Sequence, residues 1–88
     1  MNDIKKISFT IKALNDAIDY LDAVARSKNS NIKECIENLD IAKRNENEWE
    51  IEYYSEQIEN LEAESNACTK AKEIILEALV NCKTGKLL

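Results

Sequence analysis

The feature that most constrains this chain is a regular spacing of apolar residues near its N-terminus. Side chains of isoleucine, leucine and alanine recur there at alternating intervals of three and four residues: Ile4, Ile7, Ile11, Leu14, Ile18, Leu21 and Ala25. This is the heptad pattern of helices that pack together with a left-handed twist. It predicts a first helix over residues 3–28, about 39 Å long at 1.5 Å per residue.

A second apolar stripe of the same period occupies the C-terminal half of the chain. Ser65 and Lys72 fill its two polar gaps, and its apolar members are Ile51, Tyr54, Ile58, Leu61, Cys68, Ile75, Leu79 and Cys82. Asn45 and Asn47 are each followed three places later by glutamate, so either could cap the helix. Gly85 suits a helix stop. We therefore predict a helix over residues 47–83, about 55 Å long, followed by a tail at 84–88.

The segment between these stripes is harder to assign. Residues 27–31 are polar, and Asn31 followed by Glu34 has the form of a capping box. We therefore predict a break at 28–31 and a short helix over 31–44. The two shorter helices placed end to end match the third in length. This favours an all-α fold, a long antiparallel hairpin of three helices with one arm kinked and coiled-coil-like packing, while a compact three-helix globule stays open.

Composition narrows the functions available to one small domain spanning residues 1–88. The chain has no proline and one glycine, which disfavours strands and tight turns, and it has no histidine. A histidine general base and a Cys/His zinc site are therefore excluded. We expect no enzyme, no catalytic residue, no metal and no cofactor. The three cysteines lie on the apolar stripes, so we interpret them as small core residues.

An acidic block is the first candidate interaction site. Residues 46–64 contain eight glutamates and no lysine or arginine, and the whole chain has a net charge of −5. Tryptophan and tyrosine, which are enriched at binding hot spots, lie among these acids. The candidate partner-binding residues are Glu46, Glu48, Trp49, Glu52, Tyr53 and Glu56. A basic protein surface is the expected partner, whereas the alternative is a solvated face with acids that favour a helix N-terminus.

The first helix carries a second apolar surface. At 100° per residue, five of its side chains fall within about 80° of one another, roughly opposite the main stripe. They are Phe9, Ala13, Ala17, Tyr20 and Val24. A lone hairpin cannot cover both surfaces, so we predict that this one is the interface of a homo-oligomer. The alternative is that Phe9 and Tyr20 are isolated exposed aromatics.

Together these patterns favour a non-catalytic interaction module: an adaptor, inhibitor or regulator, in its most specific form an accessory protein of a phage or mobile element that binds a host protein. One alternative is an oligomeric bundle that sequesters a small anionic ligand such as a nucleotide at Lys5, Lys6, Lys12, Arg26 and Lys28. Another is a small dimeric hairpin that binds nucleic acid through the same residues, which the net negative charge disfavours. No stretch is apolar enough for a membrane span, so we expect a cytoplasmic protein of a bacterium, or of the host cell if the chain is phage-encoded.

Overall fold

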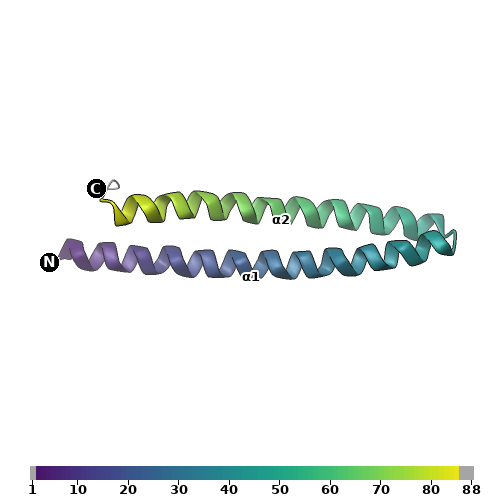
Figure 1. Ribbon diagram of the computed structural model, residues 1–88, viewed down its shortest axis with the longest axis horizontal. Helices are drawn as coiled ribbons and strands as arrows, with labels where there is room; N and C mark the ends of the chain where they lie inside the picture. The colour runs from purple at the N-terminus through teal and green to yellow at the C-terminus, as the bar shows by residue number, and fades with distance from the viewer. Residues whose placement is uncertain (1, 86–88) are drawn as a thin grey trace.

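Two long helices form an elongated hairpin in the computed structural model, which describes residues 2–85. Helix α1 spans Asn2–Arg44 and helix α2 spans Glu48–Lys83, joined by a tight turn. The helices run side by side in opposite directions, so the start of α1 and the end of α2 lie at one end, called the open end below (Figure 1). The molecule measures 67 × 16 × 14 Å. The predicted all-α hairpin is confirmed.

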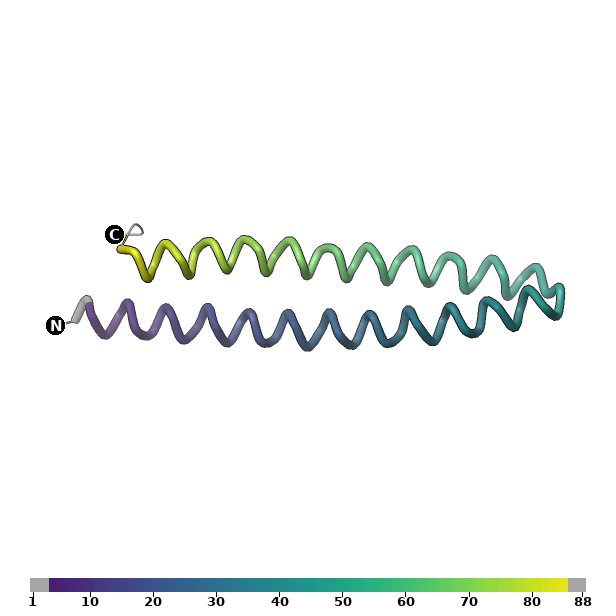
Figure 2. The backbone as a smooth tube through the Cα atoms, in the orientation of Figure 1, coloured from purple at the N-terminus to yellow at the C-terminus, as the bar shows by residue number. Residues whose placement is uncertain are grey.

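The predicted three helices and the kink at 28–31 are wrong. Helix α1 continues through these residues, and Figure 2 shows the backbone tube winding on without interruption. The alternating spacing itself continues from Ala25 through Lys28 to Ile32, with a lysine in place of an apolar residue. The Lys28 ammonium pairs with Glu64 on α2, and the lysine is half-buried at this position of the stripe. Asn31 lies inside the helix and is not a cap.

The turn explains where the chain does reverse. The amide of Asn47 donates to the carbonyl of Ala42 and the amide of Glu46 to that of Lys43, at 3.0 and 3.2 Å. These are the two hydrogen bonds of a Schellman motif. Glu46 takes the left-handed conformation that this motif needs, with φ of 54°. The Asn47 side chain then accepts a 3.2 Å hydrogen bond from the Glu50 amide, so Asn47 is the N-cap of α2.

The contact between the helices is a single thin line. Among the described residues, only Ala42 and Leu79 are buried, at 0% and 7% exposure. The other stripe residues from Ile7 onwards are half-buried, and so are the three cysteines, which are free thiols. Two helices can shield only one side of each other's stripe, so much apolar surface stays accessible to water.

The C-terminal end of α2 lies where the sequence predicts it. Thr84 is the C-cap, and Gly85 has φ of +75°, the left-handed conformation that glycine adopts without strain. The predicted stop is confirmed. The rest of the predicted tail, residues 86–88, lies outside the described residues.

Candidate partner-binding site

Three aromatic rings gather on the first two turns of α2. Trp49 and Tyr53 are one turn apart and stack face to face, with ring centroids 5.4 Å apart and planes within 8°. Tyr54 meets the edge of Tyr53 at 5.2 Å and 79°. Tyr54 belongs to the helix contact, whereas Trp49 is 71% exposed and Tyr53 44%. The pair thus presents a flat aromatic surface to solvent beside the turn.

Two carboxylates flank this stack. Trp49, Tyr53, Glu52 and Glu56 line a shallow hollow of about 250 Å³. The geometry follows from the spacing, because Trp49 with Tyr53 and Glu52 with Glu56 form neighbouring columns, each at i, i+4. The structure therefore brings together four of the six predicted partner-binding residues. Glu46 in the turn and Glu48 at the start of α2 are exposed and do not line the hollow.

Among the residues that the structure describes, no lysine or arginine pairs with these carboxylates. The ion pairs found between residues 4 and 85 join Lys12 to Asp16, Lys28 to Glu64, and Lys72 to Asp22. None of these includes Glu52 or Glu56. The negative charge beside the aromatic pair is therefore available to a positive group from outside.

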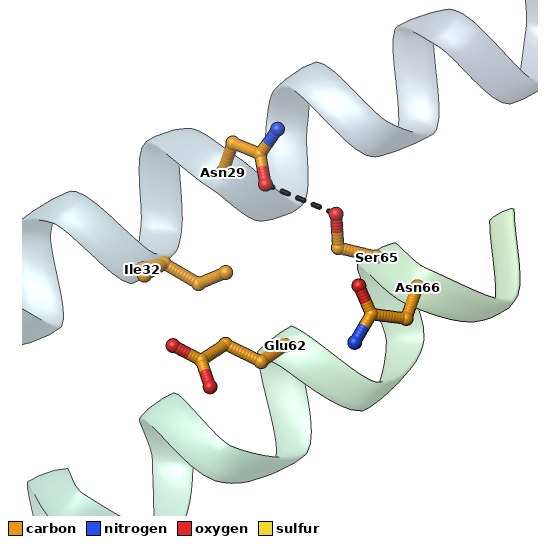
Figure 3. Close-up of a pocket in the computed structure, with 5 residues that line it drawn as sticks. All are labelled: Asn29, Ile32, Glu62, Ser65 and Asn66. Carbon is orange, nitrogen blue, oxygen red and sulfur yellow. Dashed lines mark hydrogen bonds between the residues drawn. The ribbon is translucent and has the colours of Figure 1, made fainter. Parts of the chain in front are cut away.

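Polar groups join the helices near the middle of the hairpin. Lys72 Nζ lies 2.7 Å from Asp22 Oδ1, and the Ser65 hydroxyl donates a 3.0 Å hydrogen bond to Asn29 Oδ1. Figure 3 shows Asn29 and Ser65 facing each other, with Ile32 and Glu62 beside them. The hydrogen bond and charge of Glu64 raise the pKa of Lys28. Such layers fix the register of two helices, because a shifted pairing would leave them unpaired.

The predicted anion-binding residues are spread along α1. Lys5 and Lys6 lie with Phe9 and Thr10 around a hollow of about 470 Å³ near the open end. Lys12 pairs with Asp16, and Lys28 with Glu64. The exposed Arg26 lies about 30 Å along the helix from Lys5. A single chain therefore gathers only two of these five cations.

The five residues of the predicted oligomer interface differ in how exposed they are. Phe9, Ala13 and Tyr20 are exposed, while Ala17 and Val24 are half-buried at the margin of the helix contact. None of the predicted residues lies on α2, where Ile74 is 69% exposed. The Asp22–Lys72 pair places Ile74 at about the level of Tyr20 along the hairpin. The sequence signal for Ile74 was an isoleucine that lies off the apolar stripe of α2. Its level along the hairpin follows only from the pairing of the two helices.

No candidate metal site and no candidate membrane span occur in the described part of the chain. Within it, no three His, Cys, Asp or Glu side chains come together as metal ligands would. Neither helix has a stretch that is long and apolar enough to cross a membrane. A scan against protein-family models and searches of the curated proteins and of the solved structures found no match.

Proposed function

We propose that this hairpin is a non-catalytic module that binds another protein through the acidic-aromatic patch, defined as Trp49, Glu52, Tyr53 and Glu56. Its expected role is that of an adaptor, inhibitor or regulator, such as a phage or mobile-element accessory protein would have. The observation that carries the proposal is the exposed Trp49–Tyr53 stack beside two carboxylates that pair with no lysine or arginine of the described chain. The free thiols Cys35, Cys68 and Cys82 fit the reducing cytoplasm that we propose as its location.

The patch suits an arginine or lysine of the partner. A cation over the face of an exposed tryptophan or tyrosine gains about 0.5–1 kcal/mol. A guanidinium can also form hydrogen bonds with a carboxylate in a bidentate manner. The surrounding acidic block, residues 46–64, would attract a basic surface and raise the association rate. These interactions all favour the same class of partner, a protein segment that has an arginine beside other positive residues.

Trp49 is the only tryptophan, so its fluorescence reports on the patch directly. The test is a titration with an arginine-rich peptide at low and high salt. We expect the peptide to change the Trp49 emission, and the double variant Glu52→Gln/Glu56→Gln to bind about tenfold more weakly, a loss of about 1.4 kcal/mol. The matched control is Glu73→Gln/Glu77→Gln, which removes the same charge from the same helix far from the patch. Equal weakening in both double variants would contradict a specific site.

We also propose that the chain self-associates. Most stripe side chains of the described residues are only half-buried, and each leucine or isoleucine covered by a second chain contributes about 1.5–3 kcal/mol. The predicted interface residues Phe9, Ala13, Ala17, Tyr20 and Val24 are the starting point for this proposal.

A second candidate function follows from the hollow at the open end. Lys5 and Lys6 could hold the phosphates of a nucleotide while Phe9 stacks on its base. A nucleotide that binds the folded state would raise the melting temperature. Adding ATP to the wild type and to Lys5→Gln/Lys6→Gln tests this candidate. No shift in the wild type, or the same shift in both proteins, would contradict it.

A further inference from the structure

The register of the helices gives the hairpin two long edges with different chemistry. One edge carries the Asp22–Lys72 pair and the Asn29–Ser65 hydrogen bond. The other edge is formed by small half-buried residues from both helices, Ala17 and Val24 on α1 with Ala71 and Ala78 on α2. Tyr20 and Ile74 flank these four positions and are both 69% exposed. These six residues are called the charge-free face below.

Each helix contributes three of the six residues, and these three belong to a longer row of positions along the helix. On α1 the row steps by three and four residues from Thr10 to Asn31, and on α2 from Ala67 to Asn81. Between these bounds neither row contains a charged side chain, although 33% of all residues in the chain are charged. The α2 row ends towards the turn at Glu64, which pairs with Lys28. A solvated helix surface would show charges at about one position in three at this composition. Their absence indicates a surface that another apolar surface covers.

The accessible surface area of the chain indicates how much of it a partner would bury. Its accessible surface is 6784 Å², whereas a folded monomer of 10.1 kDa exposes about 5,300 Å² by the usual scaling with mass. The excess is about 1,500 Å². A standard protein interface buries about 800 Å² on each partner, so a second long hairpin would remove an area of the right order.

We propose that two copies of this chain pair through their charge-free faces about a two-fold axis and form a four-helix bundle. The alanines allow the helices of the two copies to approach closely, and Tyr20 and Ile74 of one copy pack against the alanines of the other. This inference rests on the self-association proposed above. It names the face, adds α2 to it, and is independent of binding at the acidic-aromatic patch.

Charge fixes the orientation of the pair. The half of the hairpin near the turn, residues 24–68, has eleven acidic and five basic residues, whereas the rest of the chain has six acidic and seven basic. These parts are called the turn half and the open half. A parallel pair would place two negative turn halves side by side, where their repulsion costs energy. The copies are therefore antiparallel, with each turn half beside the open half of its partner.

Light scattering of four purified proteins tests the face. We expect the wild type to have twice the 10.1 kDa chain mass, and Ile74→Glu and Tyr20→Glu to fall to the monomer mass with their helical circular dichroism retained. Val80→Glu is the matched control, since Val80 is 58% exposed on the same helix, about 120° around from Ile74. It should stay a dimer.

The outcomes separate this inference from the proposals on which it rests. A wild type that is monomeric up to millimolar concentration would overturn self-association altogether. A wild-type dimer that Ile74→Glu weakens no more than Val80→Glu does would overturn the face and leave self-association standing. The Trp49 titration reports on the acidic-aromatic patch in either case.

Energy transfer tests the orientation in the dimer. The native cysteines are first replaced by alanine, and the dimer mass of this variant is checked; they are Cys35, Cys68 and Cys82. A donor is then attached at Asn45→Cys on one copy and an acceptor at Thr84→Cys on the other. In an antiparallel pair centred on Tyr20 the labels lie about 20 Å apart along the bundle, and in a parallel pair about 60 Å apart. Strong transfer supports the antiparallel pair, and weak transfer overturns it.

Discussion

The open half and the turn half of this hairpin share one kind of inner contact and differ on the outside. Both are held by the same alternating stripe of half-buried residues along the facing sides of α1 and α2. Outside that line, the open half has five of the six residues of the charge-free face, while the turn half combines excess negative charge with the stacked Trp49 and Tyr53. The inner stripe therefore specifies the hairpin, and the outer residues specify what each half can meet.

The largest effect should come from a charge placed in the inner stripe. Leu14→Glu in the open half and Leu61→Glu in the turn half each remove a half-buried leucine and bring a carboxylate to the contact line. We expect each to lower the free energy of unfolding by at least about 2 kcal/mol and to abolish cooperative thermal unfolding by circular dichroism.

The control for this pair is Leu61→Met, which conserves volume and should cost less than about 1.5 kcal/mol. If the glutamate variants melted like Ile74→Glu, whose side chain is exposed, the division between inner stripe and outer faces would not hold.

The next effect concerns the polar layer at the border of the halves. Lys72→Leu would continue the apolar stripe where Lys72 now pairs with Asp22. Both side chains are more than a third exposed, so the lost ion pair was worth little, and the added apolar contact should dominate. We expect a melting temperature several degrees higher and more heterogeneous association, measured by thermal melts and light scattering. A lower melting temperature would mean that this ion pair stabilises the fold more than an apolar contact would.

This polar layer also shows how far the sequence could predict the fold. The stripes predicted the helices and the hairpin, because apolar spacing alone decides which side of a helix is buried. The break at 28–31 was wrong because Asn31 with Glu34 has a local capping signature, and the partners of Lys28 and Asn29 lie 36 residues away on α2. A contact across the hairpin therefore determined the structure where local preference favoured a break.

The two candidate surfaces differ in the same respect. Trp49, Glu52, Tyr53 and Glu56 are neighbours at helical spacing, so the sequence alone brought them together, and their role in binding stays a prediction. The charge-free face draws on both helices, and no pattern within α1 could add Ile74. Only the pairing of α1 with α2 places it at the level of Tyr20 along the hairpin.

A smaller gain in stability is expected in the turn. Glu46 has φ of 54°, a conformation that costs a residue with a side chain about 1–2 kcal/mol. Glu46→Gly removes that strain, but glycine also raises the conformational entropy of the unfolded state, and this offsets part of the gain in stability. The net effect should be about 0.5–1 kcal/mol, a rise of a few degrees in melting temperature. Asn45→Gly is the control, since Asn45 does not have positive φ, and it should not be stabilising.

The smallest expected effect is the pH dependence of the contact between Lys28 and Glu64. Since Glu64 raises the pKa of Lys28 above 10.5, the pair's contribution is fully present below that pH and is lost as the pH rises through the higher folded-state value. Lys28→Met lacks this contribution, so the difference in melting temperature between wild type and variant should change only in the alkaline range. Melts from pH 7 to above pH 11 measure it, and the difference cancels the ionisation of the other lysines and tyrosines common to both proteins. A change in that difference between pH 7 and 9 would mean that another group titrates with Lys28, and that the border between the halves is held by more than this ion pair.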